Sequence, residues 1–465
     1  MTRRPGTGEA VRDPDLGRVY GSDTYAWYVV VVLTITYTIS FVDRQIMALM
    51  IGPIRTDLAI SDTQVSLLIG LAFAMFYTLL GLPIARLADR YSRRAIISIG
   101  IAIWCLMTAA CGLAQTYPQL FLARIGVGVG EAALSPSALS LISDIFPTNR
   151  RGRAIAFYNM GISLGSGLAM VIGGQLLLAV GGAGRSAWPI VGDLYGWQKV
   201  FLLVGLPGLV MAALMWTVRE PERREKLQSA SGNDAAIPVR EVARFLGARW
   251  RLYGSHFLGL SVVAILTYGF LAWIPQMFVR TWEWPVARIG LAYGVVTLIS
   301  GALAVLFVSR LARAFTRRGH PDVYMRVALW ACAVGVVGAI LVPLSPTPTL
   351  AVLALVPVSV GTVAATGAGL TALMVVTPNQ MRAQASAAYY FVVNLLGLTL
   401  GPTGIALVTD YLFRDDRMLR YSMLVVSALA GLLAALCLTY NLRHYREAVS
   451  ETANWSGSPA GIRRT

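Results

Sequence analysis

Twelve apolar stretches, each about 18 residues or longer, constrain this chain more than any other feature of its sequence. The hydrocarbon core of a bilayer is about 30 Å thick, and a helix of about 20 apolar residues crosses it. An open sheet cannot, because its edge groups would lack hydrogen-bond partners in lipid. The sequence therefore predicts an all-α membrane protein with twelve transmembrane helices. They lie near residues 27–54, 64–85, 95–114, 118–143, 154–180, 198–218, 255–279, 288–309, 324–345, 348–375, 385–409 and 421–442.

The composition excludes several other classes of protein. Hydrophobic residues make up 56% of the chain and charged residues 13%, whereas soluble domains contain about 25% charged residues. A soluble enzyme, a secreted module and a nucleic-acid-binding domain are excluded, although the net charge is +16. His256, His320 and His444 lie at span ends or in loops, without a nucleophile or a metal-ligand pattern around them. We therefore expect neither an enzyme nor a metal site.

The basic residues gather in alternate loops, and this pattern predicts the orientation in the membrane. Roughly 29 of the 39 Lys and Arg residues fall on the side that carries both termini, and about eight fall on the other side. Because cytoplasmic loops carry the excess of positive charge, both termini are predicted to be cytoplasmic. The abundance of Ala, Gly and Arg is compatible with a bacterial inner membrane.

The spans are predicted to form two related six-helix bundles. The segment Ala85-Arg-Leu-Ala-Asp-Arg-Tyr-Ser-Arg-Arg94 after span two recurs as Ser309-Arg-Leu-Ala-Arg-Ala-Phe-Thr-Arg-Arg318 after span eight. Two such pseudo-symmetric halves enclose a pathway with a binding site near the middle of the membrane. The predicted parts are a tail at 1–24, a bundle at 25–218, a cytoplasmic linker at 219–250 with an amphipathic helix at 239–246, a bundle at 251–443 and a tail at 444–465.

The first of these repeated segments resembles the cytoplasmic loop motif of the major facilitator superfamily. Asp89 stands in the acidic position of the motif, and Arg313 stands at the equivalent place in the second copy. The resemblance implies the twelve-helix fold of that superfamily and transport by alternating access. It also implies that Asp89 caps the facing end of span eleven and holds the cytoplasmic side shut. The predicted gating residues are Asp89, Arg90, Arg93, Asp144 and Arg153.

A closer resemblance is to the Spinster branch of that superfamily. It is carried by Phe41-Val-Asp43-Arg44, Leu122-Ala-Arg124-Ile-Gly-Val-Gly-Val-Gly-Glu131-Ala-Ala, Ser143-Asp144-Ile-Phe146 and Gly165-Ser-Gly167. The resemblance is strong to about residue 180 and architectural beyond it. It implies substrates of the lysolipid or sphingoid type and proton exchange at the positions of Asp43 and Glu131. It further implies that Arg44 contacts an anionic headgroup.

Four charged residues lie deep inside the predicted first and fourth spans. A charged group there costs about 2.5 to 3.5 kcal/mol, so such groups usually face a cavity and a partner. Arg124 and Glu131 are seven residues apart, close to two helical turns, which places them on one face. We expect both to form one network with Asp43 and Arg44, in which the carboxyl groups exchange protons, the expected coupling ion, and the arginines are their partners. The alternative is a set of static ion pairs that fixes helix packing.

The spans of the second half contain no charged residue in their interior, from about residue 256 to 442. A small polar solute would need polar contacts from both halves, whereas an amphiphile can place its head on Arg44 and its tail among apolar residues. The predicted second-half lining is Tyr268, Trp273, Thr371, Tyr389 and Asn394, for which ordinary helix packing is the other interpretation.

These observations predict a secondary active transporter for an amphiphilic or lipid-like substrate. We expect it to act as a monomer among membrane lipids, without a cofactor. The alternative is a proton-coupled exporter of drugs or organic anions. Pro275 in span seven and Pro402 in span eleven each delete a backbone donor, and we expect helix bends there. The glycines of span five are expected to allow close helix approach; they include Gly161, Gly165, Gly167, Gly173 and Gly174.

Overall fold

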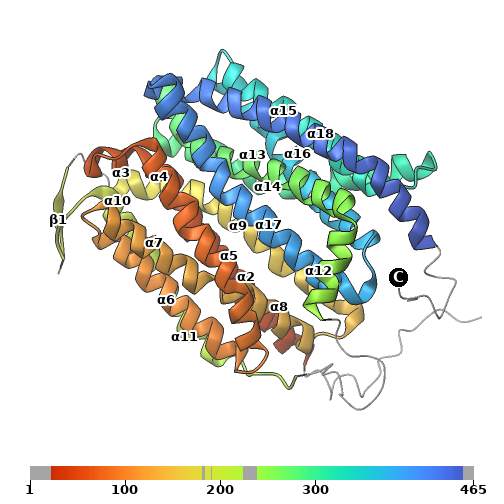
Figure 1. Ribbon diagram of the computed structural model, residues 1–465. Helices are drawn as coiled ribbons and strands as arrows, with labels where there is room; N and C mark the ends of the chain where they lie inside the picture. Colours follow the sequence, from red (N-terminus) through yellow and green to blue (C-terminus); the bar gives the residue numbers. More distant parts are fainter. Residues whose placement is uncertain (1–21, 181–183, 190, 224–237, 454–465) are drawn as a thin grey trace, which may run out of the picture.

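The computed structural model describes residues 22–180, 184–189, 191–223 and 238–453 (Figure 1). In these residues, twelve helical spans are long and apolar enough to cross a membrane. This confirms the all-α, twelve-helix prediction. Span two begins at Asp62 and span seven ends at Trp282, each a few residues beyond the apolar stretch.

The first six spans form one helical unit, and several of them consist of two helices separated by a break. Its elements are α2 (Asp23–Ile46) with the 3-10 turn η1 (Met47–Leu49), α3 (Ile51–Leu58), α4 (Asp62–Ile69) with α5 (Leu71–Ala88), α6 (Arg93–Leu113), α7 (Tyr117–Glu131) with α8 (Leu134–Ile145), α9 (Thr148–Val180), and α10 (Gly196–Gly205) with α11 (Gly208–Leu214) and η2 (Met215–Thr217). Within this unit, α2 packs on α9 and α6 packs on α7.

The last six spans form the second unit. Its elements are α13 (Trp250–Trp282), α14 (Val286–Arg317), α15 (Val323–Leu344), α16 (Pro348–Val375), α17 (Arg382–Leu407) with the π-helical η4 (Val408–Phe413), and α18 (Leu419–Ala453), with the short turns η3 (Asn379–Met381) and η5 (Asp416–Met418). Here α15 packs on α16, and α13 packs on α17 and α18.

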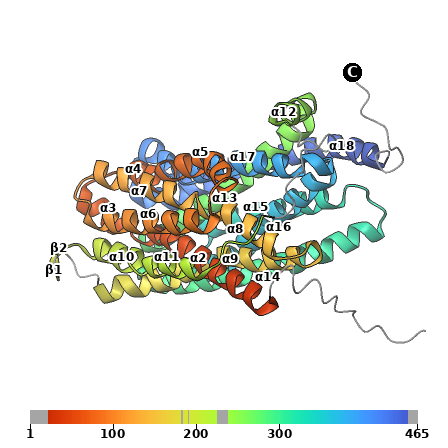
Figure 2. The ribbon, with the colours of Figure 1, turned by 90° about the horizontal axis from the view of Figure 1, so that it is seen from below.

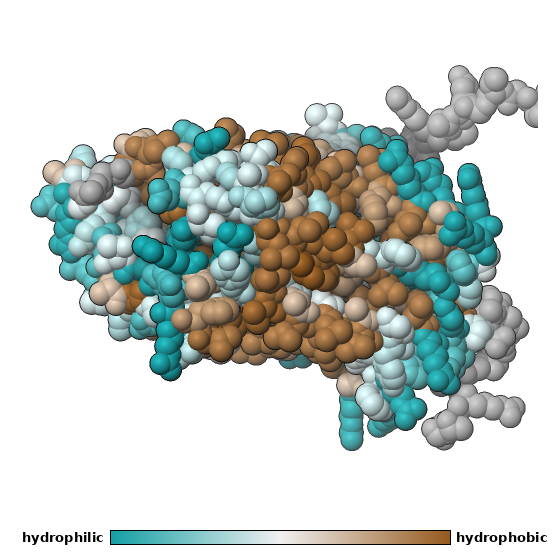
Figure 3. Space-filling view, turned by 90° about the horizontal axis from the view of Figure 1, so that it is seen from above, coloured by the Kyte–Doolittle hydropathy of each residue, from teal (hydrophilic) through white to brown (hydrophobic). Residues whose placement is uncertain are grey.

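The spans run between two faces of the molecule (Figures 1 and 2). We call the face where α2 begins and α18 ends the terminal face, and the other the opposite face. The two units meet through α9 with α14 and through α4 and α5 with α17. Hydrophobic residues dominate the middle of the surface in Figure 3, and hydrophilic residues gather at both ends. This is the pattern expected when the middle of the molecule faces lipid.

A short β-hairpin at the opposite face departs from the predicted helical chain. Strands β1 (Ser186–Trp188) and β2 (Gly192–Leu194) pair antiparallel, with Ala187 opposite Asp193. Gly192 has φ +89°, which a residue without Cβ adopts readily. The hairpin lies in the loop between spans five and six, outside the membrane-spanning helices.

Two helix breaks have clear sequence causes. Pro136 has no backbone N–H to donate to the carbonyl of Ala132, so the ladder is interrupted after Glu131. Gly70 separates α4 from α5, and a Cβ there would lie 2.5 Å from the carbonyl oxygen of Leu398 in α17. The backbones of the two units can therefore approach this closely only because residue 70 has no side chain.

The helix expected in the linker is α12 (Val239–Ala248), which lies at the terminal face (Figure 2). Val242 is its buried residue, whereas Arg240 and Arg244 are exposed. Most of the predicted N-terminal tail, the linker residues 224–237 and residues 454–465 lie outside the described residues. The first part of the predicted C-terminal tail is helical, because α18 continues to Ala453.

Candidate functional site

An ion pair between Arg44 and Glu131 lies buried inside the first unit. Arg44 occupies the last turn of α2, and Glu131 is the last residue of α7. The distance from Arg44 Nη2 to Glu131 Oε2 is 2.5 Å, and Ser40 Oγ donates to the same oxygen at 2.9 Å. A carboxylate at a helix C-terminus faces the negative end of the helix dipole. The charge of Glu131 therefore depends on these two donors.

Three aromatic rings enclose the Arg44 guanidinium. Its Cζ lies 4.6 Å from the ring centroid of Phe41, 4.4 Å from that of Phe73 and 4.8 Å from that of Tyr77. A cation within about 6 Å of a ring face is attracted to it, and more strongly where water is excluded. The rings thus hold the guanidinium in place without using its hydrogen-bond donors.

Asp43 and Arg124 lie in the same part of the first unit but are bonded to uncharged groups. Thr108 Oγ1 donates to Asp43 Oδ2 at 2.5 Å, and Arg124 Nε donates to the Leu68 carbonyl oxygen at 3.4 Å. Asp43 Oδ1 and both terminal nitrogens of Arg124 have no hydrogen-bond partner among the described residues. The four charges therefore comprise one direct ion pair and two charges held separately.

The incomplete hydrogen bonding of these buried charges makes them a candidate functional site. The side chain of Arg124 is 0% exposed, and a buried charge without full hydrogen bonding costs stability. A static packing element would be expected to satisfy its members in one conformation. Ionisable groups inside a membrane span are candidate functional sites by default.

The second unit contributes polar groups opposite this site. Tyr268 Oη of α13 donates to Asn394 Oδ1 of α17 at 3.3 Å. Tyr268 also packs against the hydrophobic cluster that includes Phe41 and Phe73 of the first unit. Two of the five predicted lining residues thus lie where the two units face each other.

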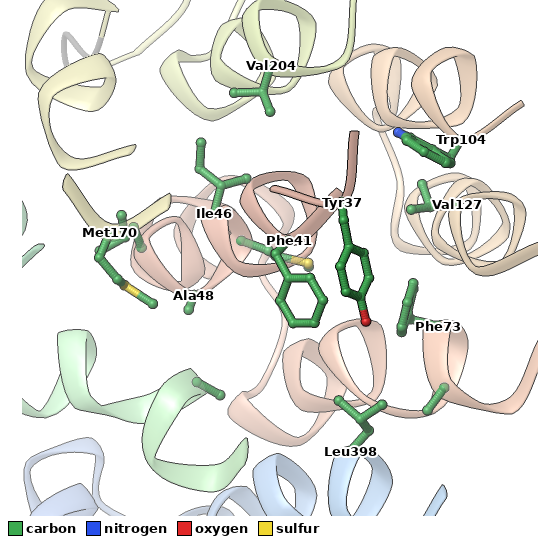
Figure 4. Packing of buried hydrophobic residues seen from close by; sticks show 14 of the residues in the cluster. Tyr37, Phe41, Ile46, Ala48, Phe73, Trp104, Val127, Met170, Val204 and Leu398 are labelled. Carbon is green, nitrogen blue, oxygen red and sulfur yellow. The ribbon is translucent and has the colours of Figure 1, made fainter. Parts of the chain in front are cut away.

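The first unit presents an aromatic surface toward α17. Figure 4 shows Tyr37 and Phe41 on α2, together with Phe73 of α5, near Leu398 of α17. Tyr37 stacks on Tyr158 with ring centroids 4.6 Å apart, and its ring lies edge-on to that of Phe41 at 5.1 Å. A hydrophobic group between the units would contact these rings.

The structure places the other three predicted lining residues elsewhere in the second unit. Trp273 is fully buried, and its Nε1 donates to the carbonyl oxygen of Pro402 at 2.9 Å. Tyr389 is buried with its ring 6.0 Å from that of His256. Thr371 is exposed and donates to a carbonyl of its own helix. The hydrogen bonds and ring contacts of these three residues are formed within the second unit.

Two of the predicted gating residues form an ion cluster at the terminal face. Arg93, the first residue of α6, pairs with Asp144 of α8 and with Glu220, whose Oε1 lies 2.8 Å from Arg93 Nε. Burial raises the pKa of Glu220, but hydrogen bonds from the Arg94 backbone N–H and from the side chains of Arg93 and Ser92 outweigh it and hold the pKa below its ordinary value. This cluster joins helices within the first unit.

The other predicted gating residues are exposed at the terminal face. Asp89 has no ion-pair partner among the described residues, and Arg90 and Arg153 are likewise exposed. Asp89 lines a surface hollow of about 320 Å³ with Arg86, Leu87 and Arg90. The latch that the resemblance implies at Asp89 is therefore not engaged in this conformation.

An ion cluster between the units lies at the opposite face, and the sequence analysis missed it. Asp62, the first residue of α4, is fully buried and accepts hydrogen bonds from both terminal nitrogens of Arg280 in α13, at 2.6 and 2.7 Å. Arg55 of α3 lies 3.1 Å from Asp62 and 2.7 Å from Asp416 of η5. The cluster thus joins the first unit to the second at two points.

Two sequence signals could have located this cluster. Ser61 and Gln64 form a capping box, which marks Asp62 as the first helical residue of span two. Arg280 directly follows the apolar stretch predicted at 255–279, which marks it as a charge at the end of span seven. Neither signal predicts the contact between Asp62 and Arg280, because the two residues are 218 positions apart in the sequence.

The carboxylates of Asp62, Asp410 and Asp416 lie within 4.8 Å of one another. Their oxygens already accept hydrogen bonds from protein donors: Asp62 from Arg280, Asp416 from Arg55, and Asp410 from the backbone and hydroxyl of Thr63. We assign no metal to this group.

Comparisons with known proteins agree with this fold. The Major Facilitator Superfamily signature matches residues 33–402. The chain is 28% identical to an MFS-type efflux pump of Mycolicibacterium smegmatis, over 92% of this chain and 95% of that protein. It is 29% identical to protein spinster homolog 1 of Rattus norvegicus, over 72% of this chain and 63% of that protein.

A solved structure with the same fold is that of a bacterial homologue of the human lysosomal transporter Spinster, in an inward-facing and unoccupied conformation. It matches with a TM-score of 0.77 and 28% identity, covering 95% of this chain and 100% of that chain. The chain therefore belongs to the Major Facilitator Superfamily, with Spinster proteins among its relatives. It is a multi-pass membrane transporter and not an enzyme.

Proposed function

We propose that this chain is a proton-coupled secondary transporter that moves an amphiphilic, lipid-like substrate across a bacterial inner membrane by alternating access. The observation that carries the proposal is the Arg44–Glu131 pair, which is buried inside the first unit with aromatic rings around the guanidinium. The relationship to Spinster proteins favours a lysolipid or sphingoid type of substrate. One chain holds the whole site, so a monomer suffices.

In this mechanism, an anionic headgroup and Glu131 compete for the Arg44 guanidinium. Protonation of Glu131 removes its charge and weakens its hold on Arg44, which is then available to the headgroup. Loss of the proton restores the ion pair and expels the headgroup. Substrate binding and proton binding thus favour the same state, which is the requirement for coupling.

Asp43 is the second proton site of the proposal. Its Oδ1 and the terminal nitrogens of Arg124 are buried without hydrogen-bond partners among the described residues. In the proposed cycle the two side chains pair when Asp43 is charged, and protonation of Asp43 separates them. The substrate tail would contact the aromatic surface of the first unit and the uncharged span interiors of the second.

We further propose that the terminal face is cytoplasmic. The positive charge of its loops supports this orientation. The conformation described here is then inward-facing, because the ion cluster at Asp62 joins the units at the periplasmic face while Asp89 stands exposed at the cytoplasmic face. An impermeant thiol reagent should label a Thr316→Cys variant only after the cells are opened; labelling of intact cells would contradict this topology.

A second candidate function is the export of drugs or organic anions through the same site. The relationship to an efflux pump over nearly the whole chain favours it. The rings around Arg44 would stack on a planar aromatic drug as readily as they contact a lipid chain. Uptake of such a drug without competition by a lysolipid would establish this second function.

The test is ligand binding to the purified protein at two pH values, measured by thermal shift. An anionic lysolipid should bind the parent more tightly at the lower pH, because proton binding and headgroup binding favour the same state in this mechanism. In Glu131→Gln, binding should be tight at both values. Asp57→Asn is the matched control, because Asp57 bonds to Trp197 within the first unit and lies outside the site. Binding of the lysolipid that does not change with pH in the parent, or preference for a small polar solute, would contradict the proposal.

A further inference from the structure

We propose that Asp62 is the central residue of a lock that holds the opposite face closed, and that Arg280 and Arg55 fasten it to the second unit. This assignment goes beyond the substrate and proton site at Arg44. It rests on the proposed function only in needing the two faces to open alternately.

The contact between Asp62 and Arg280 has the geometry of a strong interaction. Two nearly parallel N–H···O bonds of 2.6 and 2.7 Å join the guanidinium to the two carboxylate oxygens. Bidentate charge-assisted pairs of this kind are stronger than ordinary hydrogen bonds and demand one orientation. The side chain of Asp62 is 0% exposed and that of Arg280 is 11% exposed. Solvent therefore screens the pair little.

The second unit positions Arg280 for this contact. Its guanidinium lies over the Trp273 ring, with 5.8 Å between Cζ and the centroid. Trp273 is fixed in turn by its hydrogen bond to Pro402 in α17. Trp273, which the sequence analysis assigned to substrate lining, thus supports the lock. The second unit holds the Arg280 side chain in position for its contact with Asp62.

Arg55 adds a second fastening point beside the first. It shares Asp62 with Arg280 and donates to both oxygens of Asp416 at 2.7 and 3.3 Å. Thr63, next to Asp62, donates to Asp410 through its backbone N–H and its hydroxyl at 2.7 and 2.6 Å. Helix α3 and the first turn of span two are therefore bonded to three separate elements of the second unit: α13, η4 and η5.

The packing around this cluster also belongs to a closed face. Gly70 allows α4 and α5 to meet the backbone of α17 at Leu398. Between α9 and α14, a Cβ on Gly174 would lie 2.8 Å from Ala287, and one on Gly290 would lie 2.4 Å from the Met170 carbonyl oxygen. These contacts lie toward the opposite face, whereas Asp89 at the terminal face is exposed.

Alternating access requires this face to open, and opening must separate Asp62 from Arg280. In the closed state, loss of the Asp62 charge would leave Arg280 without its carboxylate partner, whereas Arg55 would keep Asp416. Removing one partner of a buried pair is strongly destabilising for that reason. In the open state both arginines reach water, so the penalty disappears. Neutralising Asp62 should therefore raise the population of the open state.

The experiment measures the distance between two spin labels across each face in lipid vesicles. Thr116→Cys and Thr349→Cys, both exposed, label the two units at the opposite face; Asn149→Cys and Thr316→Cys label the terminal face. The background carries Cys437→Ser, since the other three cysteines are buried. Asp62→Asn should raise the ratio of long to short distances at the opposite face by at least about tenfold. Arg280→Gln should do the same.

Asp57→Asn is the matched control, because it neutralises a nearby carboxylate in α3 whose partner, Trp197, lies in the first unit. It should leave both distributions unchanged. If Asp62→Asn fails to fold, Arg280→Gln and the double variant still report on the lock. Unchanged distances at the opposite face in folded Arg280→Gln, or equal opening in Asp57→Asn, would overturn the assignment.

The readout needs neither a substrate nor a proton gradient. Failure of the lysolipid binding test would therefore leave this assignment standing, and failure of the distance test would leave the Arg44 site standing. A transport assay adds one distinction. If the lock acts only on conformation, Asp62→Asn should change the rate of transport and keep the pH dependence of substrate binding. Glu131→Gln should remove that pH dependence.

Discussion

The two six-helix units place their buried charges in different parts of their spans. In the first unit, Arg44 and Glu131 pair in the interior of the bundle. In the second, buried charge lies at the span ends, as at Asp322 before α15, whose carboxylate accepts from Arg326 and Arg446. A charged side chain at a span end reaches water easily. A charged side chain in the interior of a span is costly and usually has a function. The difference supports the proposal that proton exchange occurs in the first unit.

At the terminal face the two units carry the same brace with opposite polarity. In the first unit, Arg93 at the start of the third span pairs with Glu220 after the sixth. In the second, Asp322 before the third span pairs with Arg446 near the end of the sixth. The repeat has kept the position of the ion pair and exchanged its signs. An ion pair whose charges can be exchanged between its two positions is typical of a packing contact. The interior charges of the first unit have no equivalent in the second, which is typical of a specific function.

The largest expected effect separates these two roles. Glu131→Gln should reduce pH-gradient-driven transport in proteoliposomes to background, because the proton site and the partner of Arg44 are lost together. Asp322→Asn, which neutralises a buried carboxylate in the other unit, should retain most transport. Equal loss in both variants at equal protein incorporation would show that the two units do not divide their roles in this way.

The two braces at the terminal face should differ in how much they stabilise the fold. Arg93→Gln breaks two ion pairs of a side chain that is 1% exposed, and we expect a loss of about 3 to 5 kcal/mol in the free energy of unfolding. Asp322→Asn should cost less, about 1 to 3 kcal/mol, since its partner Arg446 is 46% exposed. Denaturant unfolding in detergent measures both. A larger loss in Asp322→Asn would reverse the comparison of the braces.

The seam between the units provides a third contrast. Gly70→Ala brings a Cβ to 2.5 Å from a backbone oxygen of α17, and overpacking of this kind costs about 1 to 3 kcal/mol. Gly81→Ala, in the same span but with no atom within 4 Å of its Cβ, should be neutral or stabilising by up to about 1 kcal/mol. Thermal unfolding compares the two. Equal effects would mean that the close approach of α5 and α17 at Gly70 does not constrain the fold.

The smallest effect is a pH dependence of stability that arises from the second brace. Burial raises the pKa of Asp322, but the hydrogen bonds from Arg446 and Arg326 outweigh it and hold the pKa below its ordinary value. A lowered pKa in the folded state means stabilisation that is complete above the unfolded value of about 3.9 and is lost as the pH falls through the folded value. The melting temperature of the parent should thus fall more steeply below about pH 4 than that of Asp322→Asn. Parallel curves would contradict this.

Much of the fold could be predicted because its signals are local. Apolar stretches long enough to span reveal each helix, and the repeated loop segment reveals the two units. The site was predictable in part for the same reason: Asp43, Arg44, Arg124 and Glu131 are conspicuous as charges within apolar sequence. Their hydrogen-bond partners were not predictable, since Asp43 bonds to Thr108 and Arg124 bonds to the carbonyl of Leu68, and the two charged residues do not bond to each other.

Trp273 shows that the hydrogen-bond partner of a side chain cannot be predicted from the sequence alone. An aromatic residue in a span is compatible with both lining and packing, and only its hydrogen bond to Pro402 and its contact with Arg280 reveal a place beside the lock. Asp62 and Arg280 raise the same difficulty, because each resembles an ordinary loop residue until the partner is known.

The residues alone thus establish a membrane protein of twelve helices in two repeated units, with interior charges in the first. These properties depend on the hydrophobicity and charge of consecutive residues, and the sequence contains that information directly. The partner of each charge, the closed opposite face and the disengaged Asp89 depend on how helices distant in sequence pack. Burial and hydrogen-bond geometry are properties of that packing, so they become known only with the three-dimensional arrangement.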